Sequence, residues 1–202
     1  MNIGTKSFLF GAHQFLLHPI FVAWAWCKIY GFPFDIRLWF GFFLHDIGYI
    51  GKPNMDGPEG ETHPELAAKI MSRLFGQTWG NFCRYHSRFA AKRDGAKFSR
   101  LCVADKLAIS LTPAWLYLPM VNATGEIAEY MAMGKQAESN SKGVNKYESM
   151  KLSSDNQRQW YSGVQEYLRR WADVHRDERP DTWTPTTHNS NRQPINDAGV
   201  WK

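Results

Sequence analysis

The segment FGFFLHDIGYIGK at residues 40–52 sets an imidazole and a carboxylate side by side, directly after an almost entirely apolar run. The pattern predicts a helix from about Asp35, a plausible N-cap, to Asp46. Such a helix would deliver His45 and Asp46 into a buried environment. Because a buried carboxylate is costly unless it is paired or bound to a metal ion, these two residues are the first candidates for a functional site.

Outward from this segment, apolar residues recur at helical spacing nearly everywhere, and no convincing alternating strand is present. We therefore predict an all-α fold with one helix from near His18 to Tyr30. The glycine- and proline-rich stretch 47–61 is expected to be a long loop, and such loops are often functional. A capping box of Thr62 and Glu65 should begin the next helix. Further helices are predicted at residues 78–93, 97–111 and 115–133.

The chain of 202 residues and 23.3 kDa is long enough for one compact domain. We expect a core at residues 1–133, a polar linker at 134–156 and an extended tail at 178–202. Between linker and tail, residues 157–177 are predicted to form an amphipathic helix that packs back on the core. Its N-cap candidates are Ser153, Ser154 and Asp155.

Composition argues against several classes of protein. The three cysteines are far apart and form no CxxC pair, so we expect no disulfide framework and a reducing, cytoplasmic setting. No secretory signal is expected either. Polar residues interrupt the apolar stretch 8–29, which leaves no run long enough to span a membrane, so a membrane partner is not expected. A membrane-associated helical protein that uses the aromatic N-terminal region is kept as an alternative.

Asp105 raises the same question as Asp46, because it is the one acid in the apolar helix predicted at 97–111. It either forms a buried ion pair or binds a metal ion. Its neighbour Lys106 is a poor partner, since adjacent helical residues point about 100° apart. Together with His45 and Asp46, Asp105 is therefore a candidate ligand.

Taken in order, His18, the pair His45-Asp46 and the distant Asp105 resemble the HD-domain superfamily of metal-dependent phosphohydrolases. The resemblance covers about residues 10–112. It implies a helical bundle, an HD domain, in which these four residues ligate metal.

Two more histidines extend the resemblance to two-metal members such as the HD-GYP cyclic-dinucleotide phosphodiesterases. His63 precedes a proline at a predicted helix start, and His86 follows downstream. The chain departs from that subgroup at Tyr49, where the HDxGK lysine is expected, and at Ser87, where a second histidine is expected. It also contains no GYP string, so the substrate of that subgroup does not carry over.

Four imidazoles and two carboxylates are a mixed nitrogen and oxygen donor set, which suits Mn, Fe, Ni, Co or Zn. We expect one or two such divalent ions. With two ions, about 3.5 to 4 Å apart, Asp46 could bridge them while a metal-activated hydroxide attacks phosphorus.

The role of several histidines stays open at this level. His63 could simply be solvated at its helix start, although the His-Pro context favours ligation. His13 competes with His18 for the early ligand position, or orients it. His175 and His188 lie in the last helix and the tail, where a solvated role is expected.

The net charge of +5 is concentrated in one segment. Residues 84–106 hold seven Lys and Arg against two Asp, while the rest of the chain holds 17 basic and 17 acidic residues. This favours a pocket for a small phosphorylated anion over an extended nucleic-acid surface. Arg88, Lys106 and the loop residue Lys52 are candidate phosphate contacts and, with Asp46, the predicted catalytic residues.

We therefore predict a metal-dependent phosphohydrolase that acts on a nucleotide or another small phosphorylated metabolite, and the six-ligand set favours a phosphodiesterase. A nucleotidase or a deoxynucleoside triphosphate hydrolase is the first alternative. A non-catalytic HD module that binds a nucleotide is the second. The number of metal ions and a homo-oligomeric state are left open.

Overall fold

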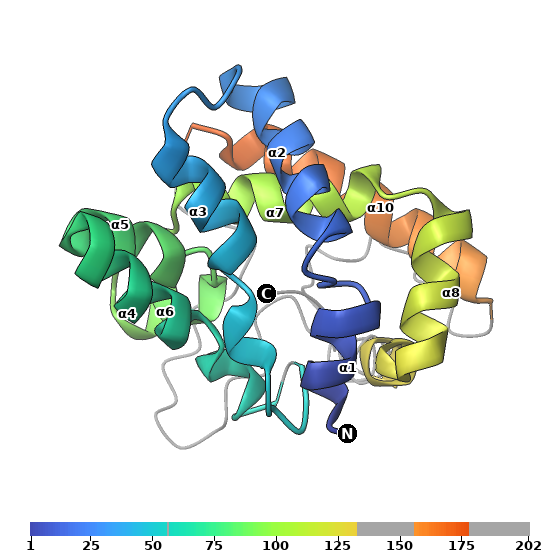
Figure 1. Cartoon of the computed structure of the whole chain (residues 1–202). Helices are drawn as coiled ribbons and strands as arrows, with labels where there is room; N and C mark the ends of the chain where they lie inside the picture. Colours follow the sequence, from blue (N-terminus) through green and yellow to red (C-terminus); the bar gives the residue numbers. More distant parts are fainter. Residues whose placement is uncertain (56, 133–155, 178–202) are drawn as a thin grey trace.

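A computed structural model describes residues 1–55, 57–132 and 156–177 (Figure 1). These residues form helices and no strand, which confirms the all-α prediction. The predicted linker, apart from Asn156, and the predicted tail lie outside the described residues. The named helices are α1 Ile3–Phe10, α2 Leu17–Tyr30, α3 Ile36–Leu44, α4 Pro64–Phe75, α5 Gln77–Arg84, α6 Arg88–Arg93, α7 Arg100–Leu111, α8 Ala114–Thr124 and α10 Gln157–His175, with 3-10 turns η1 Ile47–Tyr49 and η2 Gly60–Thr62.

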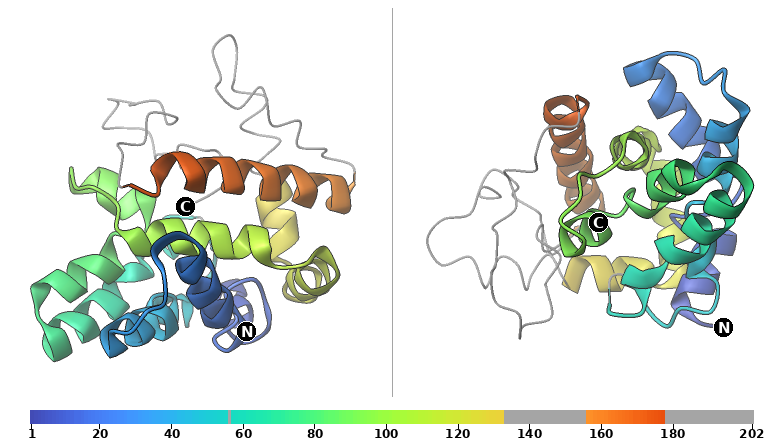
Figure 2. Two further views of the ribbon diagram at one scale, coloured as in Figure 1. Left: turned by 90° about the horizontal axis from the view of Figure 1, so that it is seen from above. Right: turned by 90° about the vertical axis from the view of Figure 1, so that its left-hand side faces the viewer.

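Helix α7 lies at the centre of the molecule, between α2 on one side and α10 on the other (Figure 2). One set of its apolar side chains, including Leu101 and Ala104, packs with α2 and α3. Another set, including Val103 and Ile109, packs with α8 and α10. Both faces of α7 are therefore covered, which explains why its sequence is apolar nearly all round.

Local signals in the sequence begin the two helices that lead to the site. The side chain of Gln14 accepts hydrogen bonds from the backbone N–H groups of Leu16 and Leu17, so it provides an acceptor for donors at the start of α2. Pro19 then falls in the first turn, where proline is tolerated. Asp35 accepts a hydrogen bond from the N–H of Arg37, which confirms it as the N-cap of α3.

The predicted capping box at the start of α4 is wrong. Thr62 ends η2, and its hydroxyl donates to the carbonyl oxygen of Glu59. Glu65 instead pairs with Arg84 and Arg93, at 3.0 Å each. The helix begins at Pro64, directly after His63. Proline is tolerated at this first position because a residue there has no helical acceptor for its N–H, and proline has no N–H.

The single helix predicted at 78–93 is also wrong, because α5 and α6 are separate helices. The helical conformation is interrupted at residues 85–87. Ser87 then caps α6 by accepting a hydrogen bond from the N–H of Ala90. The helix predicted from residue 97 begins only at Arg100.

Helix α10 packs on the core as predicted, although Asn156 caps it through the N–H groups of Arg158 and Gln159 rather than any of the three residues proposed. Its buried stripe includes Trp160, Val164, Leu168 and Trp171.

The expectation that His175 is solvated is wrong. Its exposed fraction is 0%, because the ring stacks on Trp171 with centroids 4.3 Å apart and Nδ1 donates to the Trp171 carbonyl oxygen. His188 lies outside the described residues.

Within the described residues, no single helix is both long and apolar enough to cross a bilayer. Helices α7 and α8 pass that test only as a pair, and they are bent by 101° at their junction.

Candidate metal centre

The first group of candidate ligands joins three separate helices. His18 comes from the first turn of α2, His45 and Asp46 follow α3, and Asp105 comes from the middle of α7. The Nε2 atom of His18 lies 3.0 Å from Oδ1 of Asp105 and 3.3 Å from Nε2 of His45. Oδ2 of Asp46 lies 3.2 Å from Nε2 of His45 and 3.5 Å from that of His18. All four side chains are buried and could hold one ion.

A second group uses the other oxygen of the same aspartate. Oδ1 of Asp46 lies 3.5 Å from Nε2 of His63 and 3.5 Å from Nε2 of His86. The two imidazole Nε2 atoms are 2.9 Å apart, and all three residues are buried. Asp46 thus faces both groups, as expected of a carboxylate that bridges two ions.

Three of the imidazoles are oriented in the same way. Each places Nδ1 within hydrogen-bond distance of the backbone carbonyl oxygen three residues earlier, and only an N–H can donate to that oxygen. In a neutral imidazole with its proton on Nδ1, the Nε2 atom carries a lone pair, which here points into the cluster. The pairs are His45 with Phe42, His63 with Gly60 and His86 with Cys83.

The opposed rings of His63 and His86 test whether a metal ion fits. With both Nδ1 atoms donating, two lone pairs face each other at 2.9 Å, an arrangement that is unfavourable without a positive charge near both. Burial lowers the pKa of His86, which disfavours a proton as that charge. Nitrogen and carboxylate donors with this arrangement suit a divalent transition ion. The residues therefore fit a metal.

The electrostatics of the first group also call for positive charge. Burial raises the pKa of Asp46, but the imidazoles around it outweigh burial and hold that pKa well below its usual range. Burial lowers the pKa of His45, but Asp46 and Asp105 outweigh it and raise this pKa to about 10, so a proton on Nε2 supplies positive charge there until a metal ion replaces it. Two buried carboxylates thus attract a cation to this position.

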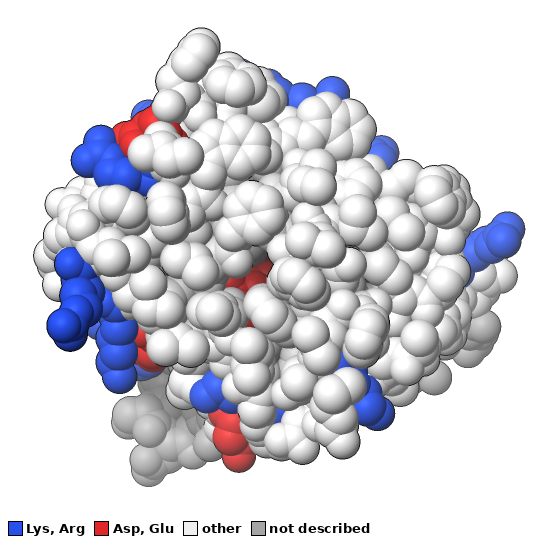
Figure 3. Space-filling model, viewed as in Figure 1, with Lys and Arg blue, Asp and Glu red and all other residues white. Residues whose placement is uncertain are grey.

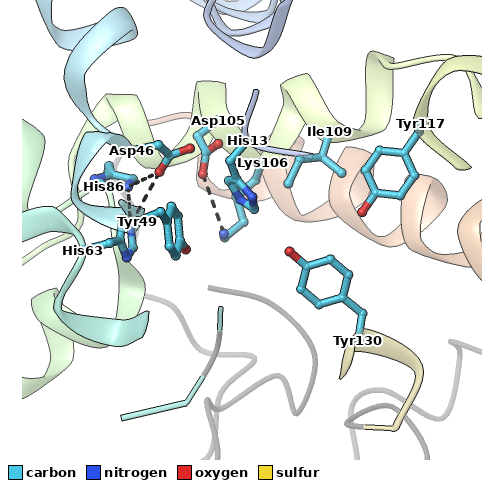
Figure 4. A pocket seen from close by; sticks show the side chains of 10 residues that line it. All are labelled: His13, Asp46, Tyr49, His63, His86, Asp105, Lys106, Ile109, Tyr117 and Tyr130. Atoms are coloured by element: carbon cyan, nitrogen blue, oxygen red, sulfur yellow. Dashed lines mark hydrogen bonds and ion pairs between the residues drawn. The ribbon is translucent and has the colours of Figure 1, made fainter. Parts of the chain in front are cut away.

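A pocket opens beside the two groups (Figure 4). Its cavity volume is about 20 Å³, room for about one water molecule. The lining residues are His13, Asp46, Tyr49, His63, His86, Asp105, Lys106, Ile109, Tyr117 and Tyr130.

The structure brings only one of the three predicted phosphate contacts to this pocket. Lys106 is buried and lines it, with Nζ 4.0 Å from Oδ2 of Asp105. Lys52 lies elsewhere, where its ammonium group donates to the hydroxyl of Thr62. Arg88 is buried against α10, with its guanidinium 5.1 Å from the ring centroid of Trp171. Neither Lys52 nor Arg88 lines the pocket.

Of the two early histidines, His18 belongs to the first group of candidate ligands, whereas His13 belongs to neither group. Its ring lies against that of His18, with centroids 5.5 Å apart, and it lines the pocket. Its Nδ1 is 3.1 Å from Oγ of Ser7 and 3.8 Å from Oε2 of Glu126. Burial lowers the pKa of His13, but Asp46 and Glu126 outweigh it, so the pKa is raised.

Sequence reasoning missed Glu126 and the pocket tyrosines Tyr117 and Tyr130. Glu126 is fully buried and accepts hydrogen bonds from Ser7, Ala12, Thr124 and Tyr130. Nothing local in the sequence marks it, because Ser7 and Ala12 are 119 and 114 residues away.

Tyr49 stands where the two-metal phosphodiesterases have a lysine, and its ring stacks on that of the ligand candidate His63. The ring centroids are 4.1 Å apart and the planes are nearly parallel, at 4°. Tyr49 therefore supports an imidazole of the second group.

No family model, no curated protein and no solved structure matches the chain. The helical fold and the buried histidine and aspartate cluster are compatible with an HD-like fold.

Proposed function

We propose that the chain is a metal-dependent phosphohydrolase of the HD superfamily with a two-ion centre. The observation that carries this proposal is the position of Asp46, whose two oxygens face two separate groups of buried donors. The six residues of these groups are the six that the HD-like sequence pattern selects.

The donor set defines the kind of ion. Imidazole nitrogens outnumber carboxylates, which favours Mn, Fe, Co, Ni or Zn over Mg. Bound at these positions, such ions would lower the pKa of a water molecule and hold the oxygens of a phosphoryl group.

Two further side chains of the pocket have roles in the proposed reaction. The ammonium group of Lys106 is buried at the lining and would neutralise charge that develops on a phosphoryl oxygen. His13 is held on its Nδ1 side by Ser7 and Glu126, which leaves Nε2 to give a proton to the leaving oxygen.

The substrate class is a phosphoester of a nucleotide or another small phosphorylated metabolite. The second ligand group favours a phosphodiester, since two-metal members of the resembled superfamily cleave that bond. A nucleotidase or triphosphohydrolase uses the same donors and is the alternative within this class, and a non-catalytic nucleotide-binding module is the alternative outside it.

Metal content and turnover test the proposal together. We expect purified protein loaded with Mn²⁺ to hold up to two equivalents by elemental analysis and to hydrolyse bis(p-nitrophenyl) phosphate faster than p-nitrophenyl phosphate.

His45→Ala should lower metal content and reduce turnover by at least about a hundredfold. His63→Ala should remove about one equivalent, since only the second group loses a donor. Asp173→Asn, an exposed carboxylate on α10, is the matched control and should change neither value.

Less than one equivalent of metal in the wild-type protein, with no effect of His45→Ala on content or turnover, would contradict the catalytic proposal. Stoichiometric metal without turnover on diesters, monoesters or nucleoside triphosphates would instead identify a binding module. Full metal content in His63→Ala would limit the centre to one ion.

A further inference from the structure

Large apolar side chains are concentrated on one face, formed by α2, α3 and the segments that flank them. We call this surface the aromatic face. It carries ten of the fifteen exposed large hydrophobic residues that the structure describes. They are Phe10, Phe15, Leu16, Ile20, Trp24, Phe32, Phe34, Ile36, Phe40 and Phe43.

The aromatic face has little charge of its own. Between Lys6 and Asp35, the only Lys, Arg, Asp or Glu is Lys28. Asp35 and Arg37 follow and neutralise each other through a 2.6 Å ion pair. In the space-filling view, this side of the molecule is mostly white, and basic atoms lie mainly toward its edges (Figure 3).

Helix α2 shows most clearly that no other part of the described chain covers this face. Its sequence is apolar nearly all round, as in helices that are buried on every side or that contact lipid. Val22 and Ala25 pack in the core, yet Ile20 and Trp24 are 56% and 46% exposed on the outer side. With 14 residues, α2 is about 21 Å long, too short to cross a bilayer of about 30 Å but able to lie along its surface.

At one end of this face, the loop between α2 and α3 projects two phenylalanines. Phe34 is 88% exposed and Phe32 is 60% exposed, and their rings meet edge to face with centroids 4.8 Å apart. Figure 1 shows this loop at the top edge of the molecule. Such a protruding aromatic pair can enter the headgroup region of a bilayer without disturbing the fold.

The candidate metal centre lies behind the same face. In Figure 3, acidic atoms are visible at the base of a hollow near the middle of the white surface. In the matching view of Figure 1, this position lies between α3 and the segment that joins α1 to α2, the elements next to His18 and Asp46.

We propose that the aromatic face docks on the surface of a phospholipid bilayer that contains anionic lipids. The apolar side chains would enter the interface, while Lys6 and Lys28 would meet anionic headgroups. A second copy of the chain on this face would close the hollow above the metal centre, whereas a bilayer would present lipid phosphoesters to that hollow. The choice of a bilayer over a second copy rests on the proposed function, but the docking itself does not.

Vesicle flotation with the full-length protein in detergent-free buffer tests the docking. We expect the wild type to float with vesicles of phosphatidylcholine and phosphatidylglycerol, and more weakly with phosphatidylcholine alone. The double variant Phe32→Ser with Phe34→Ser should bind at least about tenfold less. The matched control is Trp115→Ser, which removes an aromatic residue that is 75% exposed on α8, outside this face, and should bind as the wild type does.

Circular dichroism and size-exclusion chromatography with light scattering establish that the variants fold and define their oligomeric state. A wild type that floats with neither vesicle type overturns the proposal. A dimer that the double phenylalanine variant converts to a monomer, without vesicle binding, shows that a second copy occupies the face and also overturns it. His45→Ala should float like the wild type, so failure of the hydrolase proposal leaves this result unchanged.

Discussion

Asp46 shows how one residue can define two sites. Its Oδ2 atom lies 3.2 Å from Nε2 of His45, while its Oδ1 atom lies 3.5 Å from Nε2 of both His63 and His86. The adjacent pair His45-Asp46 is visible in the sequence, but neighbouring residues alone do not reveal which oxygen faces which partner. The division of donors into two groups depends on where η1 and α4 place the carboxylate and the second pair of imidazoles.

Gly48 permits the close approach of η1 to the start of α4. A Cβ atom at this position would lie 1.9 Å from the carbonyl oxygen of His63 and 2.7 Å from its carbonyl carbon. Because both are backbone atoms, Gly48→Ala must push η1 away from His63 and separate Asp46 from the second group. We expect a loss of about one equivalent of metal and an unfolding free energy lower by about 2 kcal/mol, measured by elemental analysis and denaturant unfolding.

Gly41→Ala is the control for this substitution. Its Cβ would meet side chains rather than backbone, the Phe82 ring at 3.0 Å and Sγ of Cys83 at 3.7 Å, so metal content should be retained. If Gly48→Ala kept both the full metal content and the wild-type unfolding free energy, close packing of η1 against His63 would not be required for the second group.

At the scale of elements, the break between α5 and α6 positions His86. The turn at residues 85–87 directs the imidazole toward Asp46, and Ser87 restarts the helix by capping it. Apolar periodicity continues across the break, so the pattern alone suggests one helix. Ser87 was the local signal for a new N-terminus, since serine is a favoured N-cap residue.

Helix α10 stabilises the central helix that carries Asp105 and Lys106. The hydroxyl of Tyr161 donates to carbonyl oxygens at the end of α7, and Leu168 is fully buried between the two helices and their neighbours. Leu168→Ala should therefore lower the unfolding free energy by about 3 kcal/mol, measured by denaturant unfolding.

An exposed residue of the same helix, Arg170, provides the control substitution for Leu168→Ala. Among the described residues, Arg170 forms an exposed ion pair with Glu166 one turn away, so Arg170→Ala should change the unfolding free energy by less than about 0.5 kcal/mol. Equal effects of the two substitutions would mean that α10 does not contribute to the stability of the core.

At the scale of the whole molecule, Glu126 joins segments from opposite ends of the core. Its carboxylate accepts hydrogen bonds from Ser7 in α1, from the backbone N–H of Ala12, and from Thr124 and Tyr130 beside the pocket. Burial raises the pKa of Glu126, but His13 and these donors outweigh burial and lower it below its ordinary value of 4.5.

This depressed pKa predicts the direction of a pH effect on stability. A carboxyl group with a lower pKa in the folded state stabilises the protein above its unfolded pKa, and the effect is lost as pH falls through the folded value. Glu126→Gln should lower the unfolding free energy at pH 7 by about 2 to 3 kcal/mol, because donors lose a charged acceptor. The difference from wild type should shrink as pH falls below about 4.5, and denaturant unfolding across that range measures it. A difference that stays constant with pH would show that Glu126 is not ionised in the folded protein.

Much of the fold and most of the candidate site could be predicted from the sequence. Helical periodicity predicted the fold class and α10, while Asp35 and Pro19 placed helix starts, because these features act within one or two turns. The capping box at Thr62 and the solvated His175 were wrong because each depends on partners distant in the chain, whereas the continuous helix at 78–93 was wrong although Ser87 gave a local signal for the break. Glu65 pairs with α5 and α6, and His175 is buried against Trp171 and Phe98.

The sequence by itself determined which side chains offer nitrogen and oxygen donors, and that apolar helices would bury them. Only the tertiary structure decided that Asp46 faces two donor groups, that Lys106 rather than Arg88 or Lys52 reaches the pocket, and that Glu126 holds His13. The physical reason is the distance along the chain over which each interaction acts. Helix formation and burial follow from neighbours within a few residues, whereas distances between side chains on different helices follow from how those helices pack.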